Sequence, residues 1–288
     1  MERHSFHAMG TEVEVLVETE ARDEAAAAFA GLELEFRRLE SILTRFDPTS
    51  ELSRLNDNGM LAAGPELREV VELALVARDR SQGRFDPTVH DAVVAAGYDR
   101  SFELIDGSVA VEAPAGAAGG GVRVGESLIE LDPGVRLDLG GIGKGYAVDR
   151  VLPFVGVLGP ALVNAGGDLA VSAPLEAGAW PVAVETPTGS LCLGLTSGAL
   201  ATSGSDRRRW QAGEESRHHL IEPKTGFPSE SDLLRVTAFG RSAVEAEIRA
   251  KSLFLAGEAA ASFEAEFGST PAALVTVDGR WRLVGGLR

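Results

Sequence analysis

Four glycines fall within the six residues from Gly140 to Gly145, and this run constrains the backbone more than any other part of the sequence. Because glycine adopts conformations that other residues avoid, the run predicts a tight turn with exposed backbone N–H groups. A strand-like segment from Leu137 leads into the turn, and a helix-like segment follows it. Lys144 lies next to the expected helix start, where its ammonium adds positive charge. The turn therefore predicts a phosphate contact, although a tight turn with a surface lysine explains the same residues equally well.

The glycine run matches neither of two common nucleotide-binding motifs. A P-loop would need a glycine in place of Asp138 and a hydroxyl residue in place of Gly145. A dinucleotide fingerprint would need a glycine in place of Tyr146. A phosphate site here would therefore be of another type.

The hydrophobic pattern predicts an α+β fold. Apolar residues at three- and four-residue steps indicate helices over residues 23–43, from Pro65 to Gly83, and over residues 244–255. Alternating or short apolar runs indicate strands at residues 10–18, 127–131, 161–163, 180–185 and 234–239. The 288 residues are enough for one large domain or for two interleaved lobes.

The chain is strongly acidic, with a formal net charge of −16. Such a charge repels polyanions at long range, so nucleic acid is not an expected partner. An anionic ligand would need local compensation from backbone N–H groups, a placed Lys or Arg, or a cation.

Two features bear on the compartment. The single cysteine, Cys192, stands between Leu191 and Leu193 and is expected to be a small buried residue, so no disulfide framework is possible. The N-terminus lacks the apolar run of a signal peptide, and about 18 apolar residues never run together. We expect a cytoplasmic protein that does not insert into membranes.

Three further segments could carry chemistry. Asn164–Leu169 holds a second glycine pair, Gly166 and Gly167, followed by Asp168, and could form part of a phosphate cradle or only a turn. Arg217–Pro228 holds adjacent histidines, of which one could be a general base and either could be structural. The tetrapeptide FDPT occurs at residues 46–49 and again at 85–88, which indicates two similar turns.

Together these segments resemble the FAD:protein FMN transferases, the ApbE-like flavin transferases. Seven segments occur in the order seen in that family, across nearly the whole chain: MGTEVEV at Met9, RFDPTSELSRLN at Arg45, FDPTV at Phe85, DLGGIGKGYAVDR at Asp138, NAGGD at Asn164, ATSG at Ala201 and HHLIEPKTGFP at His218. The resemblance implies one α+β domain over residues 1–288, made of two interleaved lobes with FAD in the cleft between them. It also implies the activity: FMN moves from FAD onto a Thr or Ser hydroxyl of an acceptor protein, and AMP is released.

The resemblance implies roles for particular residues of this chain. His219 matches the histidine required for activity, and we expect it to accept the hydroxyl proton. The positions expected to contact FAD, including the second glycine turn, are Met9, Phe46, Phe85, Asp86, Thr88, Asp138, Lys144, Gly166, Gly167 and Asp168. For a magnesium ion, Gly141 matches a ligand that acts through its backbone carbonyl, and Glu247 matches an Asp ligand.

The most informative departure from the family lies at residue 251. The remaining metal ligand in the family is a Thr four residues after the Asp, and this chain has Lys251 there. An ammonium has no lone pair and cannot bind a metal. Either Glu247 and Lys251 form an ordinary helix pair, or the ammonium replaces the cation and itself neutralises the diphosphate.

Three other functions compete with flavin transfer. The same residues could hydrolyse FAD to FMN and AMP, with water in place of the acceptor hydroxyl. The protein could also bind FAD without turnover, if Lys251 abolishes a metal site. A Ser-His-Asp hydrolase has less support, because the sequence lacks a G-x-S-x-G segment.

Overall fold

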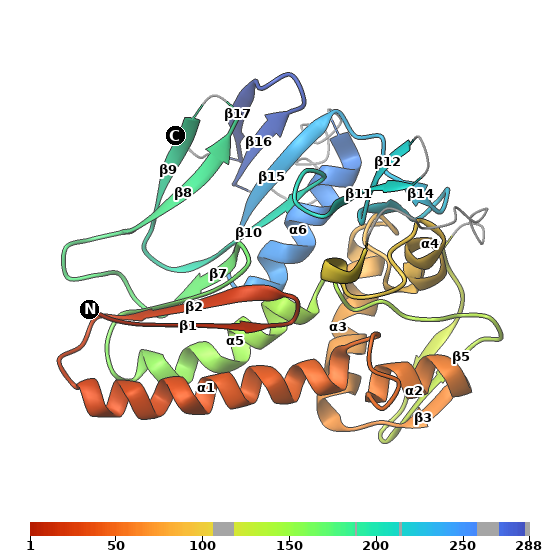
Figure 1. Cartoon of the computed structure of the whole chain (residues 1–288), viewed down its shortest axis with the longest axis horizontal. Helices are drawn as coiled ribbons and strands as arrows, with labels where there is room; N and C mark the ends of the chain where they lie inside the picture. The colour runs from red at the N-terminus through yellow and green to blue at the C-terminus, as the bar shows by residue number, and fades with distance from the viewer. Residues whose placement is uncertain (106–117, 188, 213–214, 258–270, 286–288) are drawn as a thin grey trace. The chain divides into compact units, whose positions relative to one another are not determined.

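The computed structural model describes residues 1–105, 118–187, 189–212, 215–257 and 271–285. The chain forms two compact units (Figure 1). Unit 1 consists of Met1–Arg38, Ile142–Ser203 and Asp232–Arg288, and unit 2 consists of Leu39–Gly141 and Gly204–Ser231. Both units are assembled from separated stretches of sequence. That they act as one domain stays a prediction.

Unit 1 is built on an eight-stranded sheet in the order β1-β2-β6-β7-β10-β15-β16-β17. The strands are β1 (Glu2–Ala8), β2 (Thr11–Val17), β6 (Ala161–Ala165), β7 (Asp168–Val171), β10 (Gly198–Gly204), β15 (Leu233–Gly240), β16 (Ala272–Thr276) and β17 (Trp281–Val284). Neighbouring strands are antiparallel from β1 through β10 and again from β15 through β17.

Helices pack on one face of this sheet and a hairpin packs on the other (Figure 1). The helices are the first part of α1 (Arg22–Leu43), α5 (Gly143–Gly156) and α6 (Ala243–Ala256). The hairpin is β8 (Trp180–Thr186) with β9 (Gly189–Leu195), and its Trp180 and Leu195 join the leucines of the opposite sheet face in one apolar cluster. Since side chains alternate along a strand, Leu169 and Val171 of β7 face the hairpin, which turns Asp168 toward the helices.

Unit 2 combines short helices with small sheets. Its helices are α2 (Glu51–Asn58), α3 (Pro65–Arg80) and α4 (His90–Ala95), with single 3-10 turns at Pro87–Val89 and Phe102–Leu104. Its strands are β3 (Met60–Ala62), β4 (Val122–Val124), β5 (Leu128–Leu131), β11 (Arg209–Ala212), β12 (Glu215–His218), β13 (Ile221–Glu222) and β14 (Phe227–Pro228). Tyr98, Trp210 and Ile221 form an apolar core with α4, and the Trp210 indole N–H donates to the Ala96 carbonyl at 3.0 Å.

The α+β prediction is confirmed, and the expected helices appear as α1, α3 and α6. The strand expected before the glycine turn is absent: residues 135–139 pair with no strand. Instead, the Asn56 side chain accepts from the Leu137 N–H at 2.7 Å and donates to the Leu137 carbonyl at 2.9 Å, as a neighbouring strand would.

The burial expected for Cys192 is wrong, because this residue is exposed. It lies on β9, where alternation directs Leu193 and Leu195 into the apolar cluster and Cys192 to the opposite side. The leucines that flank Cys192 in sequence therefore say nothing about its own burial. Within the described residues, none of the helices combines the length and the apolar character that a membrane crossing needs.

Candidate functional site

The predicted site residues fall into both units. Unit 1 holds Met9, Lys144, Gly166, Gly167, Asp168 and Glu247. Unit 2 holds Phe46, Phe85, Asp86, Thr88, Asp138, Gly141 and His219.

Lys144 lies in the first turn of α5, as the glycine run predicts, but its ammonium is held by two carboxylates. Its Nζ pairs with Glu247 of α6 at 2.8 Å and with Asp168 of β7. The second oxygen of Glu247 accepts from the backbone N–H of Gly145 at 3.0 Å. We call Lys144, Asp168 and Glu247 the lysine cluster. Three predicted site residues that are far apart in sequence therefore meet in one place.

Burial dominates the electrostatics of the lysine cluster. Asp168 is 3% exposed, and this burial raises its pKa to about 6, although the Lys144 ammonium lowers it. Glu247 raises the pKa of Asp168 further, and the positive charge of Lys251 lowers it. Lys251, one helical turn after Glu247 on α6, thus adds a second ammonium to the surroundings of Asp168.

Gly145 allows α5 and α6 to approach closely. A Cβ at this position would lie 2.8 Å from the backbone carbonyl carbon and oxygen of Ala243, in the first turn of α6. Asp149 of α5 stabilises the contact between the two helices, since its carboxylate accepts from the N–H groups of Ala243 and Val244 at 2.7 and 3.0 Å. Part of the glycine run therefore serves helix packing.

We expect Gly145→Ala to lower the free energy of unfolding by about 1–3 kcal/mol, because the added methyl group would press on the α6 backbone. Gly31→Ala is the matched control, since Gly31 also lies in a helix but has open space around its Cβ position. The control should gain up to about 1 kcal/mol from helix propensity. Urea unfolding of both variants measures the difference, and a stabilised Gly145→Ala protein would contradict the packing role.

The second glycine turn joins β6 to β7. Gly166 and Gly167 have φ values of 66° and 103°, in the region that favours glycine. Both amides already donate within the protein, Gly166 to the Glu12 carbonyl at 3.1 Å and Gly167 to Asn164 Oδ1 at 2.9 Å. A tight turn thus accounts for these glycines without a ligand. Met9 lies in the similar turn between β1 and β2, with a φ of 52°.

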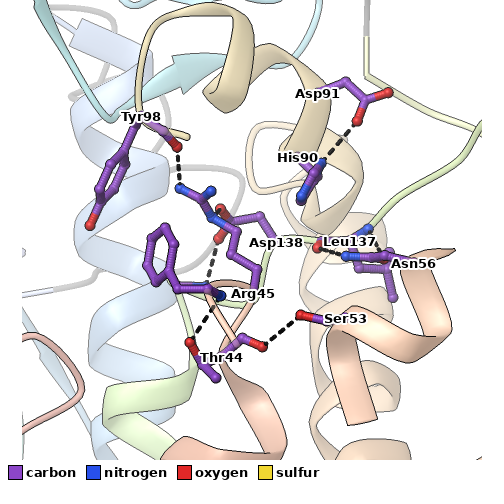
Figure 2. Close-up of polar contacts among 11 residues, drawn as sticks. Thr44, Arg45, Ser53, Asn56, His90, Asp91, Tyr98, Leu137 and Asp138 are labelled. Atoms are coloured by element: carbon purple, nitrogen blue, oxygen red, sulfur yellow. Dashed lines mark hydrogen bonds and ion pairs between the residues drawn. The ribbon is translucent and has the colours of Figure 1, made fainter. Parts of the chain in front are cut away.

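In unit 2, Arg45 organises the surroundings of Asp138 (Figure 2). The Arg45 guanidinium pairs with Asp138 at 2.8 Å, and the Arg45 side chain is only 6% exposed. It also donates to the Tyr98 carbonyl at 2.6 Å. The guanidinium carbon lies 4.2 Å from the Phe46 ring centre and 4.8 Å from that of Tyr98, within the range of cation–π attraction. Asp138 is therefore held in one orientation by Arg45, and the exposed Phe46 ring lies against the same guanidinium.

The two FDPT segments adopt the same local structure. Asp47 Oδ1 accepts from the Thr49 N–H and hydroxyl at 2.8 and 2.7 Å, and Asp86 Oδ1 accepts from the same groups of Thr88 at the same distances. The second copy differs because the Thr88 hydroxyl also accepts from the Gly119 N–H at 2.8 Å. Asp86 and Thr88 thus position a nearby glycine loop, while the neighbouring Phe85 side chain is buried.

The adjacent histidines have different surroundings. His218, at the end of β12, is buried, and both its ring nitrogens are engaged: Nδ1 accepts from the Leu220 N–H at 3.2 Å, which leaves Nε2 to donate to the Ser229 carbonyl at 3.0 Å. Burial also lowers the pKa of His218. His219 follows the strand and is partly exposed. His218 therefore has a structural role, because it holds Leu220 and Ser229, the residues that flank the paired strands β13 and β14.

The sequence did not single out His90 or assign a role to Arg45. His90 begins α4, and its Nδ1 lies 2.9 Å from Asp91, which pairs with Arg136 at 2.6 Å (Figure 2). Burial lowers the pKa of His90, while the charges of Asp91 and Asp138 oppose this shift. The sequence feature that could have drawn attention to His90 is its position directly after the FDPTV segment.

Glu247, one of the two residues matched to magnesium ligands, has other partners in this structure. In the part of the chain that the structure describes, no three His, Cys, Asp or Glu side chains gather closely enough to hold a metal ion. Glu247, the carboxylate matched to a metal ligand, is already engaged with an ammonium and a backbone amide. Gly141, the other matched ligand, belongs to unit 2. Within the described residues, Glu247 is therefore not part of a group of three or more carboxylate, His or Cys side chains, whereas a hard divalent cation prefers several oxygen ligands.

Comparison with solved structures confirms the fold. The ApbE protein of Thermotoga maritima superposes with a TM-score of 0.85 at 24% sequence identity, covering 98% of this chain and 96% of that one. The flavin transferase ApbE of Vibrio cholerae gives a TM-score of 0.79 at 21% identity, with 98% and 96% covered. Both comparisons show that this chain has the same fold as these two proteins.

The sequence comparisons show the family as well as the fold. The chain is 27% identical over 296 residues to the FAD:protein FMN transferase of Treponema pallidum, covering 91% of this chain and 82% of that protein. The model of the ApbE family matches residues 9–273. The chain therefore belongs to the ApbE family, as its seven ordered motifs indicate.

Proposed function

We propose that the protein is an FAD:protein FMN transferase. The observation that carries the proposal is the family match over residues 9–273. In the reaction, a Thr or Ser hydroxyl oxygen of an acceptor protein attacks the phosphorus on the FMN side of FAD. The bond from this phosphorus to the bridging oxygen breaks, and AMP leaves with that oxygen. FAD is thus a substrate rather than a redox cofactor.

The residues of the chain would position and polarise the reactants. His219 would accept the proton of the attacking hydroxyl. Because Nδ1 of His219 is shielded from solvent, we assign this role to Nε2. Lys144, at the start of α5, would attract the diphosphate together with the backbone amides of that turn. In unit 2, Asp138 and the Phe46 ring would contact other parts of FAD, and Arg45 would keep Asp138 in place. We assign no step to magnesium.

The expected affinity order follows from these assignments. If the glycine turn and Lys144 meet the diphosphate, the protein should bind FAD at least about tenfold more tightly than FMN, since FMN lacks the second phosphate and the charge-assisted contacts to it. Calorimetric titration with FAD, FMN and riboflavin measures the order. Equal affinity for FAD and FMN would contradict the assignment of this turn to the diphosphate.

Product analysis separates transfer from its rivals. With FAD and a candidate acceptor protein, transfer adds the mass of FMN less one water to the acceptor and releases AMP. Hydrolysis would release FMN and AMP and leave the acceptor mass unchanged. Binding of FAD without either product would indicate a non-catalytic flavin-binding protein.

A further inference from the structure

Two carboxylates already share the Lys144 ammonium inside the protein. The Lys144 ammonium is shared between Asp168 and Glu247, which are both almost fully buried. A divalent cation could reach these oxygens only by displacing the ammonium, which would leave that charge unpaired in a buried place. Breaking such a pair is costly, because the charge left behind lacks both water and a partner. The lysine cluster therefore resists metal binding.

Lys251 strengthens this resistance. It lies one helical turn after Glu247 on α6, and its positive charge acts on Asp168. The other acidic group near Glu247 is Asp149, and its oxygens accept from the N–H groups at the start of α6. Each of these three carboxylates is thus already engaged with an ammonium group or with backbone amides.

We infer that fixed ammonium groups replace a divalent cation in this protein, and that Lys144 and Lys251 allow FAD to bind without magnesium. The inference rests on the proposed function for its ligand, FAD. The positive charge that the diphosphate requires is supplied by side chains anchored on α5 and α6. Lys251 is a binding residue in this scheme, since its ammonium takes the place of a cation.

The test begins with magnesium alone. Titration of the protein with magnesium chloride in the absence of FAD should show no binding up to millimolar concentration. FAD should then bind with the same affinity, within about twofold, in magnesium and in EDTA. Stoichiometric magnesium binding to the wild-type protein, or an FAD affinity that drops about tenfold or more in EDTA, would overturn the inference.

Two substitutions at Lys251 sharpen the test. Lys251→Met removes the charge and adds no ligand, so FAD affinity should fall about tenfold both in magnesium and in EDTA. Lys251→Thr removes the charge and adds a hydroxyl oxygen, but Lys144 still holds Glu247 and Asp168, so its FAD affinity should fall by the same factor and magnesium should not restore it. Recovery of FAD affinity in magnesium would overturn the exclusion of the metal by the lysine cluster. The matched control is Arg241→Thr, which removes a positive charge from a side chain that is 86% exposed and should leave FAD affinity within about twofold. Unchanged FAD affinity in both Lys251 variants would overturn the role of Lys251.

The inference and the proposed function fail in different ways. If none of the four proteins binds FAD, the proposed function is wrong, and the titration with magnesium alone still decides whether the lysine cluster excludes the metal. Thermal melting of each variant shows that it is folded before its affinity is compared.

Discussion

His219→Ala is expected to lower the rate of FMN transfer by about 10²–10⁴-fold while leaving FAD affinity nearly unchanged. The loss reflects the missing acceptor for the hydroxyl proton, which matters in the transition state rather than in the bound ground state. Transfer is measured by the mass of the acceptor over time, and FAD affinity by calorimetry. A fall in affinity as large as the fall in rate would show that His219 binds FAD rather than accepting a proton.

His218→Ala is the natural control, because it changes the same residue type one position away. This substitution removes the acceptor of the Leu220 N–H and the donor to the Ser229 carbonyl, on either side of the β13–β14 pair. We expect it to lower the free energy of unfolding by about 1–3 kcal/mol, with little change in the rate per folded molecule. If the two variants lose transfer rate equally and remain equally stable, His219 is not the base.

Arg45→Met is expected to lower the free energy of unfolding by about 3–5 kcal/mol. The guanidinium is nearly buried and pairs with Asp138, so its loss removes the positive charge beside a largely buried carboxylate that also accepts from the Gly140 N–H at 2.7 Å. The contact to the Tyr98 carbonyl and the packing against two aromatic rings are lost as well. Urea unfolding followed by tryptophan fluorescence measures the effect, because Trp210 lies in the core of unit 2.

Arg54→Met is the matched control for this prediction. Arg54 is exposed on α2, so its replacement should change the free energy of unfolding by no more than about 0.5 kcal/mol. The double variant Arg45→Met with Asp138→Asn should regain part of the lost stability, since no buried charge is then left alone. An Arg45→Met protein as stable as the control would contradict a stabilising role for the pair.

Local sequence patterns were sufficient for most helices and for the fold class. The helix stripes in α1, α3 and α6 and the alternation in β2 report burial directly, because the period of the pattern is the period of the element. Patterns failed where a contact came from elsewhere in the chain. The extended stretch at Leu137 carries strand-like residues, but its backbone partner is the side chain of Asn56 on α2.

In the candidate site too, local patterns predict the position of a residue but not its distant partners. The position of Lys144 at a helix start follows from the glycines around it, whereas its partner Glu247 lies 103 residues further along the chain. No spacing rule connects residues so far apart. The role of Arg45 could not be predicted either. A basic residue within a turn motif is usually solvated. Only the fold shows that Arg45 is buried and paired with Asp138.

The interleaving of the two units constrains how the nascent chain can fold. Strand β2 pairs on one side with β1, but its other partner, β6, is synthesised only after the whole first segment of unit 2. Until then, one edge of β2 has no neighbour, and the apolar side chains of Val13, Val15 and Val17 lack the cover they have in the finished protein. Unit 2 in turn waits for residues 204–231. Neither unit can therefore complete its fold until its later segments have been synthesised. The first hairpin of the emerging chain, β1 with β2, has an unpaired edge until β6 is available to pair with β2.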